Sequence, residues 1–205
     1  MNTPNKLTIA RMIATPIFFA IMLIDFKYHY LVALVLFIAA SLTDMIDGKM
    51  ARKYNLVTDF GKFLDPLADK MLTTAAYLGF MFVYGAKHGF SWQLTTIVFI
   101  VLFREFMVSS LRLVTAKGGL VVAANIWGKL KTVSQMVGII AALFFYTLVE
   151  DFGILTAFNL TELCPCIQTI IDSVIMVLFW ISAALCVISG LIYLNECKSY
   201  INTSK

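Results

Sequence analysis

Long apolar stretches alternate with short polar segments along the whole chain. Six apolar stretches can be separated, and they run roughly over Leu7–Ile24, Tyr30–Asp47, Phe63–Tyr84, Trp92–Leu113, Trp127–Val149 and Ile170–Leu194. A helix of about 20 residues crosses a hydrocarbon layer of roughly 30 Å, so each stretch has a suitable length. The segments between them carry charged residues, glycine or proline, which is typical of connections. The pattern predicts an all-α polytopic membrane protein with six transmembrane helices, folded as a single membrane domain over residues 1–205.

Composition and charge support this class and orient the chain. Hydrophobic residues make up 60% of the sequence, against roughly 45–50% in soluble domains. Of the 16 Lys and Arg residues, all but Lys27 and Lys87 fall on one predicted side of the membrane. The positive-inside rule then predicts a cell-membrane protein with both termini on the cytoplasmic side. It also puts His29 and His88 in external loops. Nucleic acid is not expected as a partner, because the net charge of +4 follows the membrane side rather than a soluble patch.

Four aspartates interrupt the second and third stretches. Asp44 and Asp47 are three positions apart, and Asp65 and Asp69 are four apart, so each pair shares one helix face. A carboxylate within a bilayer costs about 2.5–3.5 kcal/mol on insertion scales, so these groups need compensating positive charge. Divalent cations suit carboxylate oxygens. We therefore predict a cytoplasm-facing polar cavity in which the aspartates hold two divalent cations, Mg²⁺ or Mn²⁺.

Small residues and an arginine complete this element of the sequence. It reads D-x-x-D-G-x-x-A-R, then eight residues, then G-x-x-x-D-x-x-x-D. Gly48 and Ala51 leave room beside the backbone for a bulky group, and Arg52 is suited to pairing with phosphate. The alternative is an interfacial charge cluster in which the aspartates pair with nearby basic residues such as Lys70. That alternative does not require both helical spacings together with glycine and alanine at these positions.

The element resembles the signature of the CDP-alcohol phosphatidyltransferases. The matching residues are Asp44, Asp47, Gly48, Ala51, Arg52, Gly61, Asp65 and Asp69. The segments PNKLTIAR, DPLADK, REFMVSSLR and GKLKT look like those of the bacterial phosphatidylglycerophosphate synthases within this family, whereas residues 143–205 match only in hydropathy. The resemblance implies six helices, a homodimer and a phospholipid-synthesis reaction in the membrane. In that reaction glycerol 3-phosphate attacks the β-phosphorus of CDP-diacylglycerol, and phosphatidylglycerophosphate and CMP are formed.

The resemblance also implies roles for individual residues. Asp44, Asp47 and Asp65 would be metal ligands, and Asp69 would be both a ligand and the general base. The CDP moiety would be contacted by Gly48, Ala51, Arg52 and Thr58, with Thr8 nearby. These roles meet the requirements of phosphoryl transfer, which are charge neutralisation on the transferred group and a positioned base for the hydroxyl.

Basic residues form a second polar group on the fourth and fifth stretches. Arg104 and Arg112 are eight positions apart, which is about 80° around a helix, and Lys129 and Lys131 open the fifth stretch. Apart from Glu105 they have no matching acid. The cations predict a pocket for the phosphate of the acceptor, while lysines at such positions are equally typical of anchors that reach the membrane surface. The resemblance favours the pocket.

Two alternatives for the function stay open at this point. Within the same family, the acceptor alcohol can instead be phosphatidylglycerol, inositol phosphate or serine. From a different class, a cation carrier would use the aspartates as an ion site. A carrier predicts acidic residues across the whole membrane, whereas the other stretches offer none at mid-depth beyond Glu105.

Overall fold

The computed structural model of the chain describes residues 3–53, 59–88, 91–117, 126–157 and 166–203, and this described part contains helices and no strand. The long helices are α1 (Thr3–Leu23), α2 (His29–Lys53), α3 (Asp59–His88), α4 (Ser91–Lys117), α5 (Ile126–Tyr146) and α8 (Ile167–Thr203). A π-helical segment, η1 (Thr147–Asp151), continues α5, and the short helix α6 (Ile154–Ala157) follows. Each predicted apolar stretch therefore coincides with one long helix.

Four of the described helices are long and apolar enough to cross a membrane. They contain the spans Asn5–Leu23, Trp92–Arg112, Ile126–Asp151 and Ile167–Lys198. Within the described side chains, the apolar segments of α2 and α3 are shorter and cover His29–Asp44 and Lys70–Val83. The prediction of a helical membrane protein is confirmed for the described part of the chain, where four of the six predicted spans have the length and composition of a complete span.

The helices extend beyond the predicted apolar stretches, mainly at the end that carries the basic residues. Helix α2 continues to Lys53, and α8 continues to Thr203. At 1.5 Å per residue α8 is about 55 Å long, which exceeds a hydrocarbon layer of roughly 30 Å. A helix satisfies its backbone hydrogen bonds internally, so it does not have to end where the sequence becomes polar. The apolar pattern therefore underestimates these two helices.

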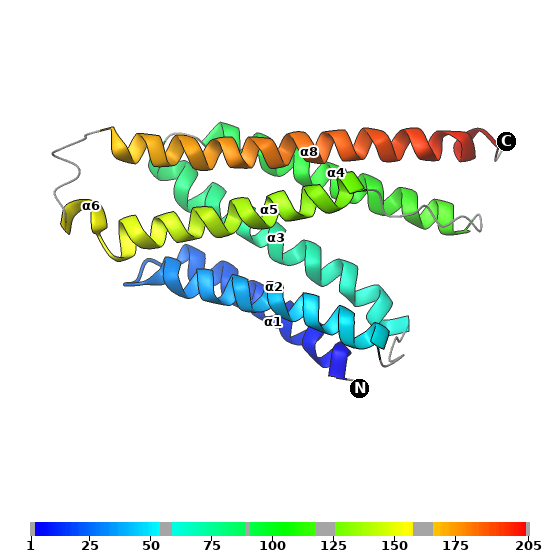
Figure 1. The fold of residues 1–205 in the computed structure, drawn as a ribbon, viewed down its shortest axis with the longest axis horizontal. Coiled ribbons are helices and arrows are strands. Elements are labelled where there is room, and N and C mark those ends of the chain that lie inside the picture. The colour runs from blue at the N-terminus through cyan, green and yellow to red at the C-terminus, as the bar shows by residue number, and fades with distance from the viewer. Residues whose placement is uncertain (1–2, 54–58, 89–90, 118–125, 158–165, 204–205) are drawn as a thin grey trace.

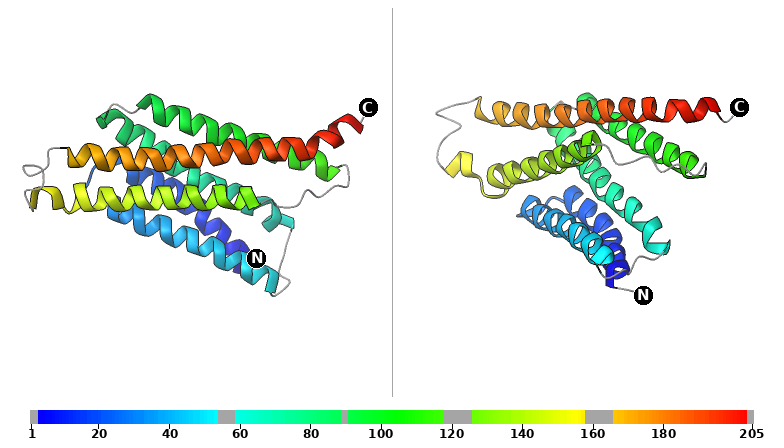
Figure 2. Two further views of the ribbon diagram at one scale, coloured as in Figure 1. Left: turned by 45° about the horizontal axis from the view of Figure 1, so that its top comes forward. Right: turned by 45° about the vertical axis from the view of Figure 1, so that its right-hand side comes forward.

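Helix α3 crosses between two groups of helices (Figure 1). Helices α1 and α2 pack against each other, and α1 also packs along α3. Helices α4, α5 and α8 form the other group, in which α8 contacts both neighbours, as both views of Figure 2 show. The two termini lie at the same end of the molecule, where α2 ends and α3 begins (Figure 1). The chain thus returns to the end from which it starts, as an even number of membrane crossings requires.

Aromatic rings and glycines make the close contacts between the helices. The ring centroid of Phe80 in α3 lies 5.4 Å from that of Phe179 in α8 and 6.2 Å from that of Tyr146 in α5. A Cβ atom added to Gly79 would lie 3.1 Å from the side chain of Met22, so a larger residue there would push α1 and α3 apart. Small residues at helix interfaces are typical of membrane proteins, where close packing replaces the hydrophobic effect between helices.

The end of the molecule opposite the termini is tied together by Asp151. Its Oδ2 atom accepts a hydrogen bond from the Leu31 N–H at 2.7 Å, and its Oδ1 atom lies 3.7 Å from His29 Nδ1. Leu31 is in the first turn of α2, where N–H groups have no partner within the helix. His29 is buried and begins α2, so the prediction of an external loop at this residue is wrong. The partner lies 120 positions away in sequence, which no local pattern reveals.

Candidate functional site

The four predicted metal-binding aspartates belong to two helices, α2 and α3, of which one ends and the other begins at the end of the molecule that holds both termini (Figure 1). Asp44 and Asp47 are in α2, and Asp65 and Asp69 are in α3. The structure describes the side chain of Asp44, while the side chains of the other three lie outside the described residues. The helical placement of both pairs agrees with the spacings in the sequence.

The predicted CDP contacts fall mostly outside the described side chains. This applies to Gly48, Ala51 and Arg52, which are in α2, and Thr58 lies outside the described residues altogether. Thr8 is described, and it is only 1% exposed. Among the described side chains, no group of three or more His, Cys, Asp or Glu residues is placed to hold a metal ion.

Asp44 forms an ion pair with Arg11 of α1. Arg11 Nη1 donates a hydrogen bond to Asp44 Oδ1. The arginine is 2% exposed, whereas the Asp44 side chain is 36% exposed, so the guanidinium is enclosed and the carboxylate can be reached from outside. The sequence placed Arg11 only among the basic residues of the cytoplasmic side. Arg11 thus supplies positive charge next to a predicted metal ligand. Such compensation is expected, because a carboxylate without a partner is costly within a bilayer.

Arg11 belongs to a buried polar face of α1. Asn5, Thr8, Arg11 and Thr15 follow one another at intervals of three or four positions, and each is less than 9% exposed. Residues at this spacing share one side of a helix. Thr15 Oγ1 donates to the Arg11 carbonyl at 2.9 Å, so this hydroxyl is satisfied within its own helix. The face is visible in the sequence as polar residues at helical spacing in an apolar segment, and it carries Thr8 on the same side as Arg11.

The chemistry at Asp44 fits a hard divalent cation. The group is an anionic oxygen ligand, and it is partly exposed, so a cation can reach the carboxylate oxygen that is not paired with Arg11. Asp47 follows about 4.5 Å further along the axis of α2, which is less than one helical turn. Carboxylate oxygens are the ligands that Mg²⁺ and Mn²⁺ prefer in proteins.

A buried group of charges joins α3, α4 and α5. Glu105 Oε1 accepts hydrogen bonds from Lys131 Nζ and from Arg104 Nη1, the latter at 3.2 Å. Lys70 Nζ lies 3.7 Å from Glu105 Oε2 and donates to Ser109 Oγ. The Lys131, Arg104 and Glu105 side chains are 8%, 11% and 13% exposed, whereas that of Lys70 is 33% exposed, so the group opens at Lys70. We refer to these five residues as the Glu105 cluster.

Two of the four predicted acceptor residues lie in this cluster and two lie outside it. Arg104 and Lys131 meet at Glu105. The guanidinium carbon of Arg112 instead lies 5.7 Å from the centre of the Tyr193 ring on α8. Lys129 is exposed, as expected for a position about 200° around the helix from the buried Lys131. The exposed lysine has the position of a surface anchor.

Sequence reasoning missed two contributors to the cluster. The alternative prediction paired Lys70 with the aspartates, but its described partners are Glu105 and Ser109. Gly190 of α8 lies against Arg104, because a Cβ atom added to it would be 3.1 Å from Arg104 Cγ. A glycine within an apolar helix often marks such a close approach.

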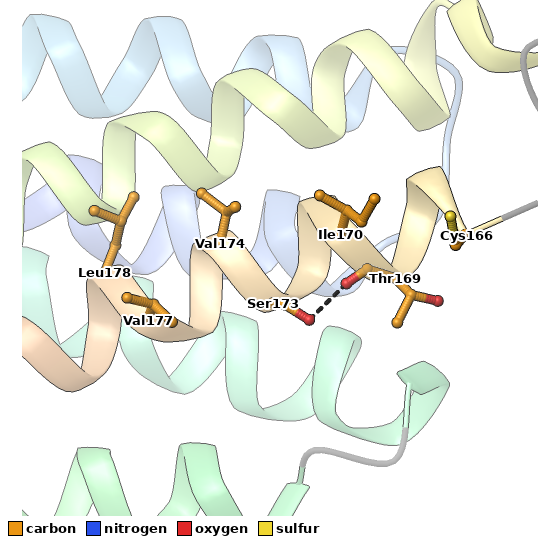
Figure 3. Close-up of a pocket in the computed structure, with 7 residues that line it drawn as sticks. All are labelled: Cys166, Thr169, Ile170, Ser173, Val174, Val177 and Leu178. Carbon is orange, nitrogen blue, oxygen red and sulfur yellow. Dashed lines mark hydrogen bonds between the residues drawn. The ribbon is translucent and has the colours of Figure 1, made fainter. Parts of the chain in front are cut away.

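A groove on α8 lies at the other end of the molecule and has a different character. It is lined by Cys166, Thr169, Ile170, Ser173, Val174, Val177 and Leu178. Figure 3 shows that the Ser173 hydroxyl is turned to its own helix, where it donates to the Thr169 carbonyl at 2.7 Å. The remaining side chains are mostly apolar, and none of those that line it is charged. The groove is therefore unsuited to binding a phosphate group.

Comparison with known proteins places the chain in a family. The sequence profile described as CDP-alcohol phosphatidyltransferase matches residues 1–188. The chain belongs to the CDP-alcohol phosphatidyltransferase family. The matched residues include the four aspartates, the polar face of α1 and the Glu105 cluster. The resemblance seen in the eight-position motif is confirmed.

Individual members of this family are similar over most of the chain. A Rickettsia bellii protein named CDP-diacylglycerol–glycerol-3-phosphate 3-phosphatidyltransferase is 36% identical over 199 residues, which are 97% of each chain. A Bacillus subtilis protein of the same name is 45% identical over 154 residues, which are 69% of this chain and 76% of that protein. A Salmonella typhimurium protein of this name is 37% identical over 140 residues, or 67% of this chain and 74% of that protein.

Proposed function

We propose that this protein transfers the phosphatidyl group of CDP-diacylglycerol to glycerol 3-phosphate, giving phosphatidylglycerophosphate and CMP for phospholipid biosynthesis. The observation that carries the proposal is the 36% identity, over 97% of both chains, to a relative named for this reaction. The Glu105 cluster supports the choice of acceptor, because three cations gathered at one carboxylate suit a ligand that bears a phosphate.

All six long helices would cross a bacterial cell membrane in this proposal, with both termini in the cytoplasm. The described apolar segments of α2 and α3 alone have lengths of about 24 Å and 21 Å, so each crosses most of a hydrocarbon layer of roughly 30 Å. The polar remainders of these helices would then form a cavity open to the cytoplasm. The common location of the two termini and the charge bias of the sequence support this orientation. The family resemblance supports a homodimer.

The residues of α2 and α3 would carry the chemistry. Asp44, Asp47, Asp65 and Asp69 would hold two divalent cations, Mg²⁺ or Mn²⁺, which when bound neutralise charge on the diphosphate of the donor. Asp69 would also accept the proton of the acceptor hydroxyl while that oxygen attacks the β-phosphorus. The new O–P bond forms as the bond from the β-phosphorus to the bridging oxygen breaks, and CMP leaves with that oxygen. A carboxylate is a weak base at neutral pH, so proton transfer has to accompany the attack.

The donor would lie between α1 and α2. Gly48, Ala51, Arg52 and Thr58 would contact its CDP moiety, as the family motif implies. The buried polar face of α1 supports a place for Thr8 beside them, because Thr8 is one turn from the Arg11 side chain that contacts Asp44. For the acceptor, Arg104 and Lys131 would hold the phosphate together with Lys70, and Arg112 and Lys129 would lie at the edge of the pocket.

Release of CMP from CDP-diacylglycerol in detergent tests this proposal. The purified protein would be supplied with Mg²⁺ or Mn²⁺ and, in separate reactions, with glycerol 3-phosphate, glycerol, inositol phosphate, serine or phosphatidylglycerol. We expect rapid release with glycerol 3-phosphate alone, because each of the other acceptors lacks either a phosphate monoester or the small glycerol group. Equal rates with glycerol and glycerol 3-phosphate, or release with phosphatidylglycerol only, would contradict the assignment and leave the family membership unchanged.

A further inference from the structure

The positive charges around Glu105 outnumber its single negative charge. In the described structure Lys70, Arg104 and Lys131 each have a nitrogen within 3.7 Å of one of its carboxylate oxygens. Three positive charges and one negative charge give the group a net charge of +2. We infer that Glu105 is an internal counter-ion, which keeps these cations gathered while the pocket is empty and gives up its contacts to the phosphate of the acceptor. The inference deepens the proposed function and rests on it for the identity of the ligand.

The carboxylate is needed because the cations come from different helices. Lys70 is in α3, Arg104 is next to Glu105 in α4, and Lys131 is in α5. Buried cations repel one another, and leaving them without an anion is strongly unfavourable. Glu105 therefore joins three helices at the point where their charges would otherwise drive them apart.

One carboxylate nevertheless leaves part of this donor capacity unused. Arg104 Nε is buried and has no hydrogen-bond partner in the described structure. A phosphate monoester carries about −1.5 to −2 charges at neutral pH and offers three oxygen acceptors. It therefore matches both the excess charge of the cluster and the buried donor that Glu105 does not reach.

Competition follows from the shared donors. Lys131 Nζ and Arg104 Nη1 both donate to Glu105 Oε1, so an incoming phosphate has to share these groups or replace the carboxylate. Every simple anion meets the same competition. Glu105 thus weakens the binding of free phosphate, and a ligand with further contacts in the pocket is favoured over it.

Thermal unfolding of the whole protein in detergent tests the counter-ion role, with inorganic phosphate as the probe. The parent, Glu105→Gln and Glu150→Gln would be titrated with sodium phosphate at constant ionic strength. Without phosphate, Glu105→Gln should unfold at a lower temperature than the parent. Its half-maximal stabilisation should need about tenfold less phosphate, because the anion no longer competes with a charge-assisted contact. Glu150 is exposed in η1 at the other end of the molecule, so Glu150→Gln should respond like the parent.

A double variant restores the charge balance in another way. Glu105→Gln combined with Lys131→Met keeps a net charge of +2, so its stability without phosphate should recover and its phosphate requirement should return to about that of the parent. If Glu105→Gln gives no folded protein, folding of the double variant would still support the inference. Failure of both variants to fold would contradict it, as would equal phosphate requirements for the parent and Glu105→Gln.

The outcome is separable from that of the proposed function. Phosphate titration involves no donor and no turnover, so it reports on the Glu105 cluster even if the acceptor is another phosphate ester. A parent that does not release CMP with glycerol 3-phosphate, together with a tenfold phosphate effect in Glu105→Gln, would remove the proposed acceptor and keep the counter-ion. A parent that releases CMP with glycerol 3-phosphate, together with equal phosphate requirements for the parent and Glu105→Gln, would support the proposed acceptor and contradict the counter-ion role.

Discussion

Replacing Gly190 by alanine should disturb the acceptor pocket from a helix that carries none of its charges. The added Cβ atom would lie 3.1 Å from Arg104 Cγ and 3.3 Å from Met107 Cε. The methionine tip can move aside at little cost. Arg104 Cγ is close to the backbone of α4, so the arginine itself has to give way by a few tenths of an ångström. The perturbation therefore reaches the Glu105 cluster through packing alone.

The size of the effect follows from the contact that moves. Arg104 Nη1 is 3.2 Å from Glu105 Oε1, near the long end of the range of about 2.7–3.2 Å for N–H···O bonds. The same displacement would move the guanidinium away from its proposed place beside the phosphate of the acceptor. Complete loss of a hydrogen bond to a charged group costs about 1.5–3 kcal/mol, so a partial loss of about 1 kcal/mol in that arginine–phosphate contact should raise the KM for glycerol 3-phosphate roughly fivefold. Alanine gains about 0.5–1 kcal/mol over glycine within a helix. That gain opposes the steric cost, and the unfolding temperature should change little.

The assay is CMP release at varied glycerol 3-phosphate, with two glycines of α5 as controls. A Cβ atom at Gly138 would meet Phe179 at 3.3 Å, away from the charges, and one at Gly128 would meet nothing within 4 Å. Gly138→Ala and Gly128→Ala should keep the acceptor KM of the parent, and the KM for CDP-diacylglycerol should stay within about twofold in all three variants. An unchanged acceptor KM in Gly190→Ala, or an equal rise in Gly138→Ala, would refute the reasoning.

Three further predictions concern other parts of the protein. Replacing any one of the four aspartates by asparagine should lower the rate of CMP release at least about 10²-fold while the protein stays folded, since each change removes a proposed ligand or the base. The variants are Asp44→Asn, Asp47→Asn, Asp65→Asn and Asp69→Asn. Near-normal turnover of Asp69→Asn would show that Asp69 is not the base. Arg104→Ala should raise the acceptor KM at least about tenfold, because it loses a charge-assisted contact with the phosphate. Arg112→Ala should raise it less than about fivefold, because the described contact of Arg112 is with an aromatic ring and is worth roughly 0.5–1 kcal/mol. Equal effects of the two variants in acceptor titrations would place Arg112 in the pocket. Asp151→Ala should lower the unfolding temperature in detergent, because it leaves the Leu31 N–H without its acceptor at a cost of about 1–3 kcal/mol. The turnover of the folded enzyme should be unchanged. A stability equal to that of the parent would show that solvent replaces this contact.

The sequence predicts the helices well because their signal is local. Apolar runs of membrane length fix the number and order of the long helices, and the break at each polar segment fixes the connections. The ends are less well predicted, because α8 keeps its internal hydrogen bonds through Asn195 to Thr203, far beyond the apolar run. The contact between Asp151 and the start of α2 cannot be read from any window of the sequence, since it joins positions 120 apart.

The candidate site is predicted in its residue types and only partly in its pairing. Helical spacing identifies the aspartates because carboxylates stand out in an apolar helix. Spacing does not say which cation each acid meets. Asp44 pairs with Arg11 from α1, and the described acidic partner of Lys70 is Glu105. Both choices depend on which helices are neighbours, and the sequence holds that information only through the packing of the whole bundle.

Helix α3 connects the two halves of the proposed reaction. Asp69, the proposed base, immediately precedes Lys70, which belongs to the Glu105 cluster. Consecutive Cα atoms are about 3.8 Å apart, so the backbone holds the proposed base and one of the proposed phosphate-binding cations in the same turn of α3, about 100° apart around the helix. In the proposed complex, a phosphate held by Lys70, Arg104 and Lys131 would keep the hydroxyls of a small attached alcohol within about one helical turn of position 69. A bulky alcohol would lack the room for that placement and an alcohol without phosphate would lack the anchor, so the short distance along α3 supports a compact phosphate ester as the proposed acceptor.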